Sequence, residues 1–398
     1  MYYPFDSRNL SYKSKLGALA EGETLRLSLL LPENLKVSRA YLMVRNDQTG
    51  NLDKIPMKRA DQKGDCFYWE CSISLNEGIY WYAFKFNSVE TEYWVTKFDH
   101  SLGEISNDGA WWQLTVYNKS YSTPSWLDGG IIYQIFPDRF YNSGKAKKNV
   151  PNDRYLVDDW AKTPDFTPQK ESDGVKFLGN DYYGGDLAGI QKKLPYLKKL
   201  GVNCIYLNPI FEAHSNHRYN TADYLKIDPL LGTKKDLKDL VKAAKKLGIY
   251  IVLDGVFSHT GDDSIYFNKE LRYEKNGAIN RSDSPYRSWY QFEEYPEKYT
   301  SWWGIDTLPA TNELDPSYLN FIIEGEDSVI AHWLRAGADG YRLDVADELP
   351  DEFIARLYRR VKEIKPDAYV LGEVWEDASN KIAYGKRRQY FVNAELDS

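Results

Sequence analysis

Cysteine is scarce in this chain of 398 residues, which contains only Cys66, Cys71 and Cys204. Their spacing matches no metal-binding pattern, and an odd number argues against a complete set of disulfides. Buried free thiols are typical of a reducing compartment, so we expect a cytoplasmic protein. The first residues also lack a basic stretch followed by an apolar core, and we therefore expect no secretory signal.

Long apolar runs and basic clusters are missing as well. No apolar run approaches the length of a bilayer span, so we expect no membrane partner. The net charge is -7 with both signs interspersed, and no basic cluster is interleaved with aromatic residues, which argues against a nucleic-acid partner. Apolar residues make up 42% and charged residues 27%, a balance typical of a globular protein whose length allows two domains.

Aromatic residues, in contrast, are abundant, with 12 Trp and 32 Tyr. Between Thr24 and Tyr117, short segments rich in β-branched and aromatic residues alternate with turn residues, which predicts an all-β, immunoglobulin-like sandwich over residues 1–120. Trp69, Trp81 and Trp94 in this region could form a platform for sugar rings. They could equally fill the core, because period-2 alternation places every second aromatic side chain inside.

The pattern changes after a linker near residues 120–130. Apolar strands then alternate with amphipathic helical segments, which predicts a parallel α/β sheet over residues 121–398. We expect Thr233 to cap one of these helices and Pro195 to kink or break another. The connection that follows the third strand is far longer than one helix requires, and we expect an inserted subdomain at about residues 257–320.

The segment Ala338–Asp344 predicts a strand that carries chemistry. It alternates apolar and polar residues, and Gly340 allows close backbone approach. Arg342 and Asp344 are two residues apart and therefore point to the same side. Because a neighbouring guanidinium lowers the pKa of a carboxyl group, we expect an ionised Asp344, as a nucleophilic carboxylate requires.

The next apolar strand, Tyr369–Trp375, carries Glu373 beside a tryptophan. Burial against an aromatic ring raises the pKa of a carboxyl group, which suits a general acid. An Asp nucleophile and a Glu acid on neighbouring strands are typical of retaining glycoside hydrolysis. Taken singly, either motif is as typical of a structural ion pair or a surface carboxylate, but the two together favour the catalytic interpretation.

A third strand end carries Asp254 and, five residues later, His259. With these residues the chain resembles glycoside hydrolase family 13, the α-amylase family, in its neopullulanase, cyclomaltodextrinase and maltogenic amylase branch. The resemblance rests on three blocks and covers nearly the whole chain. These blocks are Asp254-Gly-Val-Phe-Ser-His259, Gly340-Tyr-Arg-Leu-Asp344 followed by Val-Ala-Asp-Glu348, and Gly372-Glu-Val-Trp375.

The resemblance implies a (β/α)8 barrel, of which about five strands are present, behind a starch-binding-like N-terminal domain. It implies Asp344 as nucleophile and Glu373 as acid/base in the cleavage of α-1,4 and also α-1,6 glucosidic bonds. The substrates would be maltodextrin, cyclodextrin, pullulan or starch, and two chains would pair through the N-terminal domain. The remaining implied substrate-binding residues are Arg342, His259, Tyr219 and Asp254.

Two features of the family bear on completeness. No cofactor is required, but relatives hold a structural calcium ion, and the matching residues here are Asn142, Asn149, Gly184 and Asp186. The family's Asn-His-Asp block, which supplies a third carboxylate, is not found before Ser398. We therefore expect a C-terminally truncated chain that is inactive or very weak alone.

Two other functions fit the same sequence. One is an α-glucan-binding protein without catalysis, which would depend on the aromatic N-terminal region. The other is a transglycosylase, because a sugar hydroxyl can intercept a covalent glycosyl intermediate in place of water. Intact Asp344, Arg342 and Glu373 favour hydrolysis over simple binding.

Overall fold

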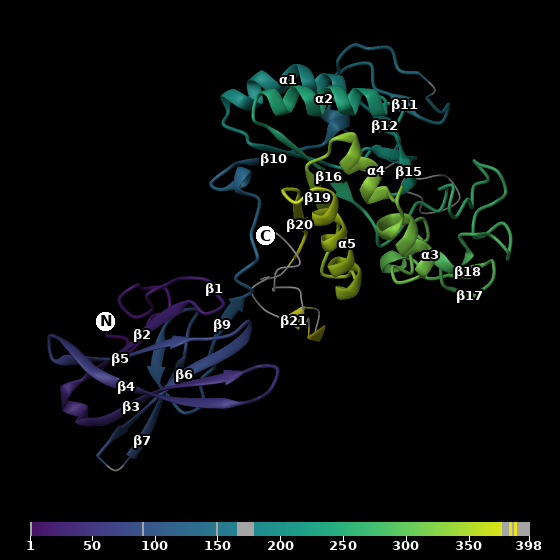
Figure 1. Cartoon of the computed structure of the whole chain (residues 1–398). Helices are drawn as coiled ribbons and strands as arrows, with labels where there is room; N and C mark the ends of the chain where they lie inside the picture. The colour runs from purple at the N-terminus through teal and green to yellow at the C-terminus, as the bar shows by residue number, and fades with distance from the viewer. Residues whose placement is uncertain are drawn as a thin grey trace. The chain divides into compact units, whose positions relative to one another are not determined.

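The computed structural model describes residues 2–89, 91–148, 150–164, 179–375, 382–383 and 386–387. The chain divides into two compact units, Met1–Tyr121 and Ser122–Ser398, and each is described by itself (Figure 1). In these residues we find no helix that combines the length and the apolar character needed to cross a bilayer.

The first unit is all-β, as predicted. One helical turn, η1 (Glu33–Leu35), interrupts it. Its strands are β1 (Leu19–Ala20), β2 (Thr24–Pro32), β3 (Val37–Asn46), β4 (Leu52–Lys63), β5 (Cys66–Ser74), β6 (Gly78–Ser88), β7 (Thr91–Lys97), β8 (Gly103–Ile105) and β9 (Trp112–Tyr117). They join into one continuous sheet rather than two separate facing sheets, because β4 pairs with β3 along its first half and with β5 along its second.

Aromatic side chains fill the core of this unit. Phe5 contacts Phe84 and Trp112 at ring-centroid distances of 4.7 and 4.8 Å. Trp69 is buried in the same core, whereas Trp81 and Trp94 are only half-buried. Their strand positions alternate with the core-facing residues, so these two tryptophans lie on the opposite face of the sheet.

The second unit is built on a parallel sheet, as predicted. Its order is β10 (Ile132–Ile135), β13 (Cys204–Leu207), β16 (Tyr250–Gly255), β19 (Gly340–Leu343) and β20 (Tyr369–Gly372). Every neighbouring pair is parallel. Strands that follow one another along the chain are also neighbours in space, as in the first five strands of a (β/α) barrel.

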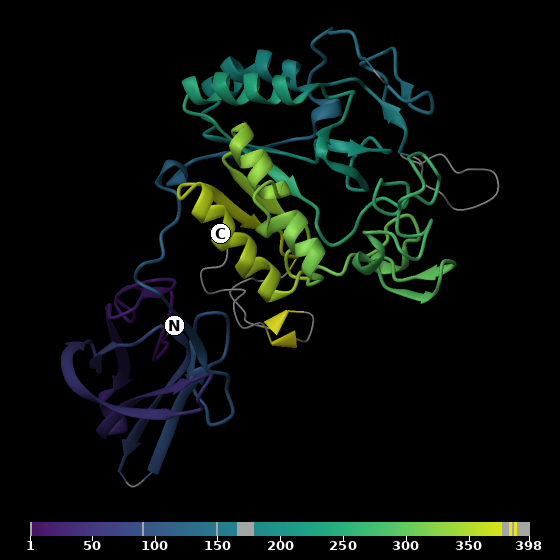
Figure 2. The ribbon, with the colours of Figure 1, turned by 45° about the vertical axis from the view of Figure 1, so that its right-hand side comes forward.

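Helices connect and cover these strands. They are α1 (Leu187–Lys199), α2 (Lys234–Lys246), α3 (Pro316–Leu319), α4 (Val329–Ala336) and α5 (Asp351–Ile364). Figures 1 and 2 show α1 beside α2 and α4 beside α5. Thr233 caps α2 and forms a reciprocal capping box with Asp236, as its sequence indicates.

The expected break at Pro195 does not occur, and α1 continues through it. A proline inside a helix removes one backbone hydrogen bond. Leu194 and Leu197 on either side of it are buried in the main core, and this tertiary packing offsets the local cost.

The long connection between β16 and β19 is rich in aromatic residues, and Tyr266, Phe267, Trp289 and Tyr290 are buried in the same core as the parallel sheet. Its regular elements besides α3 and α4 are short. They are η4 (Arg287–Trp289), β17 (Phe292–Glu294), β18 (Lys298–Tyr299), η5 (Trp302–Gly304) and the π-helical η6 (Asn320–Glu324).

The remaining short elements lie elsewhere in the second unit. They are η2 (Ser125–Leu127), η3 (Pro137–Arg139), β11 (Tyr155–Leu156), β12 (Asp181–Tyr182), β14 (Phe211–Ala213), β15 (Thr221–Ile227), β21 (Ile382–Ala383) and β22 (Lys386–Arg387).

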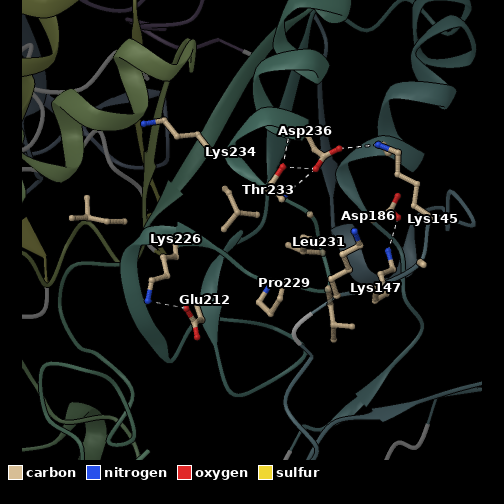
Figure 3. A pocket seen from close by; sticks show the side chains of 17 residues that line it. Lys145, Lys147, Asp186, Glu212, Lys226, Pro229, Leu231, Thr233, Lys234 and Asp236 are labelled. Carbon is tan, nitrogen blue, oxygen red and sulfur yellow. Dashed lines mark hydrogen bonds and ion pairs between the residues drawn. The ribbon is translucent and has the colours of Figure 1, made fainter. Parts of the chain in front are cut away.

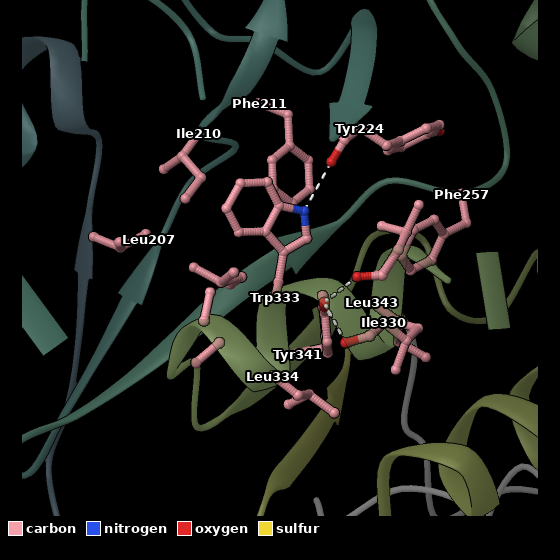
Figure 4. Close-up of a cluster of buried hydrophobic side chains, with 14 of the residues drawn as sticks. Leu207, Ile210, Phe211, Tyr224, Phe257, Ile330, Trp333, Leu334, Tyr341 and Leu343 are labelled. Carbon is pink, nitrogen blue, oxygen red and sulfur yellow. Dashed lines mark hydrogen bonds between the residues drawn. The ribbon is translucent and has the colours of Figure 1, made fainter. Parts of the chain in front are cut away.

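Trp333 of α4 lies at the centre of the core of the second unit (Figure 4). Its ring stacks on Phe211 at 5.1 Å between centroids, and its Nε1–H donates to the carbonyl oxygen of Tyr224 at 2.8 Å. The indole therefore ties α4 to both strands of the β14–β15 hairpin while its one polar atom stays bonded. This packing holds the strand β19, which follows α4, in place.

Candidate active site

Three neighbouring strands of the parallel sheet end in acidic residues. Asp254 is the penultimate residue of β16, Asp344 follows β19, and Glu373 follows β20. The register pairs Asp254 with Arg342, so the arginine on the central strand lies between the two outer ones. Because parallel strands end at the same edge of the sheet, the three carboxylates gather there.

Gly340 allows β19 and β20 to approach this closely. Its φ is +157°, and a Cβ atom added there would lie 1.9 Å from the carbonyl oxygen of Tyr369 on β20. No side chain fits at that distance. The close approach that the sequence suggests is therefore present, and it brings Arg342 and Glu373 onto adjacent strands at contact distance.

Arg342 joins all three carboxylates. Its Nη1 lies 2.9 Å from Asp254 Oδ1 and 2.7 Å from Asp344 Oδ1, and its Nη2 lies 2.8 Å from Glu373 Oε2. One planar guanidinium can hold several carboxylates in fixed directions. The side chains of Asp344 and Glu373 therefore share one small site, as a pair that acts on a common bond requires.

The backbone beside Asp344 is strained. Val345 has a φ of +42°, which is costly for a β-branched residue. Its N–H donates to Glu373 Oε2 at 3.0 Å, and the backbone N–H of Glu373 donates to Leu343 O at 3.0 Å. These bonds fix the turn after β19 against the end of β20, so the strained residue links the two candidate catalytic carboxylates.

Asp344 differs from the sequence-based expectation in its ionisation. Burial and the nearby charge of Asp254 raise its pKa to about 7, and Arg342 opposes this rise only in part. The prediction of a lowered pKa was wrong, because it counted one arginine and one carboxylate. In the folded chain the same guanidinium also serves Asp254, whose pKa burial raises to about 6.

The sequence suggested that Glu373 is buried against Trp375, but the structure shows a different arrangement. The side chain of Glu373 is 30% exposed and contacts Arg342. Trp375 is 52% exposed and meets the edge of Trp303 at a centroid distance of 5.4 Å. Proton donation by Glu373 therefore requires that its contact with Arg342 opens.

His259 and Tyr219 lie beside this cluster. His259 is buried, and burial lowers its pKa to about 4, so the ring is neutral. Its Nδ1 lies 3.0 Å from Ser258 Oγ, and its Nε2 has no hydrogen-bond partner among the described residues. Tyr219 donates its hydroxyl proton to Asp254 Oδ2 at 3.2 Å and accepts a bond from Asn208 Nδ2 at 2.9 Å.

A family model described as the catalytic domain of alpha-amylase matches residues 134–394, which is more than half of the chain. The chain belongs to the alpha-amylase family. The expected resemblance is confirmed to the level of the branch that contains neopullulanases, cyclomaltodextrinases and maltogenic amylases within glycoside hydrolase family 13. The chain is therefore a homologue of the glycoside hydrolases of the alpha-amylase family.

The relatives are longer than this chain. An amylopullulanase from Thermoanaerobacterium saccharolyticum is 37% identical over 410 residues, which cover 94% of this chain and 32% of the relative. Neopullulanase 2 from Thermoactinomyces vulgaris is 38% identical over 266 residues, or 65% and 41% of the two chains. A solved cyclomaltodextrinase structure matches with a TM-score of 0.58 and 28% identity, covering 95% of this chain and 61% of that one.

Several residues of this alpha-amylase-family site were not singled out from the sequence. Tyr206 on β13 donates its hydroxyl proton to Asp254 in a short hydrogen bond. Trp302 and Trp303 stack on each other at 5.4 Å and donate their Nε1–H groups to the two carboxylate oxygens of Glu348 at 2.9 and 2.8 Å. The aromatic-rich stretch before residue 304 and the Val-Ala-Asp-Glu348 block were the available signals.

The residues that match the family's calcium site lie at the loop after β10 and the start of α1. Asn149 is outside the described residues. Asn142 Oδ1 accepts a bond from the backbone N–H of Gly144 at 2.8 Å. Asp186 caps α1 by accepting from Gly189 N at 2.6 Å. Among the described residues, no group of three or more His, Cys, Asp or Glu side chains is arranged to hold a metal ion.

Proposed function

We propose that the protein carrying this chain hydrolyses α-1,4-glucosidic bonds of maltodextrin, cyclodextrin, pullulan or starch with retention of the anomeric configuration. Cleavage of α-1,6 bonds is the second bond type that we propose, since amylopullulanase and neopullulanase are among the relatives. The observation that carries the proposal is the single guanidinium of Arg342 shared by Asp344 and Glu373.

In the first step, ionised Asp344 attacks the anomeric carbon and forms a glycosyl ester. The bond to the leaving sugar breaks, and Glu373 donates its proton to the departing oxygen. In the second step, Glu373 takes a proton from water, the water oxygen attacks the anomeric carbon, and Asp344 leaves with its original charge. This two-step exchange returns both carboxyl groups to their starting states.

The neighbouring residues support these steps. Arg342 holds Asp344 in place, and contact between the two stabilises the charge that Asp344 regains. The Nε2 of neutral His259 is buried and has no hydrogen-bond partner among the described residues, and we assign it to a hydroxyl of the bound sugar. Tyr219 is held at its hydroxyl by Asp254 and Asn208, which leaves its ring as a flat surface for the sugar.

Variants on two substrates separate the roles of the two carboxyl groups. In the natural full-length protein, Asp344→Asn is expected to lose about 10⁴-fold or more activity on both maltodextrin and a maltosyl fluoride. Glu373→Gln is expected to lose about 10²–10⁴-fold on maltodextrin. It should lose much less on the fluoride, because fluoride leaves without protonation.

Glu352→Gln, a change of an exposed carboxylate on α5, serves as the control and should keep full activity on both substrates. Normal maltodextrin hydrolysis by Asp344→Asn would remove the proposed nucleophile. A product of inverted configuration, measured by NMR at early times, would contradict the covalent intermediate.

We also propose that the first unit binds α-glucan. On the face away from its core, Trp94 and Trp111 lie 5.6 Å apart, and Lys85 and Arg45 lie over their rings. Neighbouring indoles with cationic neighbours can stack on sugar rings and bond their hydroxyls. Trp94→Ala with Trp111→Ala should weaken retardation by starch in affinity electrophoresis. Phe98→Ala, at an exposed aromatic of the same unit, should not.

Pairing of two chains through the first unit, and a cytoplasmic location, stay predictions. The first is tested by the sedimentation behaviour of the protein with and without residues 1–120. The second is tested by cell fractionation.

A further inference from the structure

The loop after β10 is joined to the start of α1 by a largely buried ion pair. The ammonium Nζ of Lys147 lies 2.5 Å from Asp186 Oδ2, and the Lys147 side chain is only 13% exposed. Ser143 Oγ donates to the same oxygen at 2.6 Å. The other oxygen, Oδ1, accepts from the backbone N–H of Gly189 at 2.6 Å. Both oxygens of the Asp186 carboxylate are therefore occupied.

These contacts do not suit calcium. The ion takes six to eight oxygen ligands at about 2.3–2.6 Å. Asp186 is the one carboxylate of the matched set and already carries a cation at hydrogen-bond distance, while the Asn142 oxygen is bonded to Gly144. A divalent ion placed there would also be repelled by the lysine ammonium, and this repulsion is strong where water is largely excluded.

The charged side chains around the loop also argue against a bound calcium ion (Figure 3). Lys145 Nζ pairs with Asp236 Oδ1 of α2 at 2.8 Å. Lys192 Nζ of α1 donates to the carbonyl oxygen of Ser143 at 2.7 Å. Lys145, Lys147 and the exposed Lys148 all line one pocket of about 600 Å³ beside α2. Lysine ammonium groups thus already contact the carboxylates of Asp186 and Asp236 and the carbonyl oxygen of Ser143 around this loop.

Direct backbone contacts also hold the segments around Asp186 together without an ion. A Cβ atom added at Gly189 would lie 1.9 Å from Tyr141 O, and one at Gly185 would lie 2.2 Å from Pro137 O. Gly185 N donates to Asp138 O at 2.8 Å. Two glycines therefore let the loop and the helix start touch directly at these carbonyl oxygens.

We propose that the Lys147 ammonium is the resident cation of this site and takes the place that family resemblance assigns to calcium. A tethered cation cannot dissociate, so the joint between the loop and α1 does not depend on free calcium concentration. The inference concerns the stability of the second unit and is independent of the proposed hydrolysis.

Thermal unfolding of the full 398-residue chain in millimolar calcium chloride and in EGTA tests this proposal. We expect equal melting temperatures for the unchanged chain in both buffers. Lys147→Met should melt at a lower temperature in both, because it leaves Asp186 buried without its cation. Lys147→Asp should melt lowest in EGTA and recover in calcium, because it exchanges the ammonium for two more oxygen ligands.

Lys148→Asp is the matched control, since it makes the same charge change at an exposed neighbour, and it should show no calcium response. A saturable rise in melting temperature of the unchanged chain with calcium, or one calcium bound per chain by titration calorimetry, would overturn the proposal. Lys147→Met with an unchanged melting temperature, or Lys147→Asp without a calcium response, would overturn it as well. If a variant does not fold, the calcium response of the unchanged chain alone decides whether the proposal holds.

Discussion

The two units of this chain differ in how many charged side chains they bury. Among the described residues of the first unit, Lys13 is the one charged side chain that is buried, and aromatic rings make up much of the core. The second unit buries more than ten charged side chains, most of them carboxylates and arginines. Charge is expensive to bury, so the second unit accepts a cost that the first avoids.

Two clusters within the second unit show why that cost is accepted. Asp228 is paired with two arginines, Arg154 at 2.9 Å and Arg218 at 3.2 Å. Burial raises its pKa, but the arginines outweigh burial and leave the pKa lowered. At the candidate active site the ratio is reversed, because one arginine serves three carboxylates and the pKa of Asp344 is raised to about 7. Incomplete pairing of buried charge is typical of functional sites, whereas complete pairing is structural.

Among the variants that test this contrast in buried charge, Arg342→Met should have the largest effect on stability. It would leave Asp254 and Asp344 buried with a shared negative charge. We expect the second unit to lose about 3–5 kcal/mol of its free energy of unfolding near neutral pH. The loss should shrink at acidic pH, where both carboxyl groups are protonated in the folded chain. Urea unfolding followed by circular dichroism measures it, and equal loss at both pH values would contradict the electrostatic cause.

Asp344→Asn and Asp228→Asn should change stability in opposite directions. The raised pKa of Asp344 means that its ionisation is disfavoured in the folded chain, so stability falls as pH rises from the ordinary value of 3.8 towards about 7. Asn removes that cost, and the variant should melt higher than the unchanged chain above about pH 7, with no difference near pH 4.

Ionisation of Asp228 has the opposite effect on stability. Its pKa is lowered, so the ionised form contributes stability above its ordinary pKa, and Asp228→Asn should melt lower at neutral pH. Scanning calorimetry across this pH range measures both variants. Destabilisation by both substitutions would show that Asp344 is fully paired, contrary to the comparison.

Asp254→Asn should have an intermediate effect, on the pH dependence of activity. Asp254 is the second cause of the raised pKa of Asp344, after burial. Removing its charge should shift the acid limb of the kcat/KM profile of the natural protein to lower pH by about one unit. Asp339→Asn is the control, because Asp339 pairs with Lys365 at the start of β19, away from the site. An unshifted limb in Asp254→Asn would count against Asp344 as the group that must ionise.

Lys13→Met should have the smallest effect. Burial lowers the pKa of Lys13, and its ammonium donates one long bond of 3.4 Å to Gly17 O. Replacing it with an apolar chain of similar length should keep or raise the free energy of unfolding by about 1 kcal/mol or less. Chemical denaturation measures this change. A loss as large as that of Arg342→Met would remove the contrast between the units.

Much of the fold and part of the site could be predicted from local sequence. The strand and helix periodicities, the Thr233 cap and the need for glycine at position 340 depend on residues near one another in the chain. So does the placement of Asp254, Asp344 and Glu373 at strand ends. The continuous sheet of the first unit could not be predicted, because the pairing of β4 with two partners is a long-range choice.

The parts of the site that escaped prediction are contacts between distant segments. Trp302 and Trp303 meet Glu348 more than 40 residues away, and Tyr206 meets Asp254 from another strand. Lys147 meets Asp186 across 39 residues. No local pattern distinguishes such a lysine from the many exposed lysines of the chain.

By itself, the sequence determined which residues lie at the ends of parallel strands, because periodicity and turn residues act over a few positions. It thereby determined the family and the pair of carboxylates that the proposed chemistry uses. Only the tertiary structure decided their charge states, because the pKa of Asp344 depends on burial and on Asp254, which lies 90 positions earlier and reaches it through the register of β16 and β19. The ionisation of a buried group is a property of its surroundings in space, which neighbours in the chain do not specify.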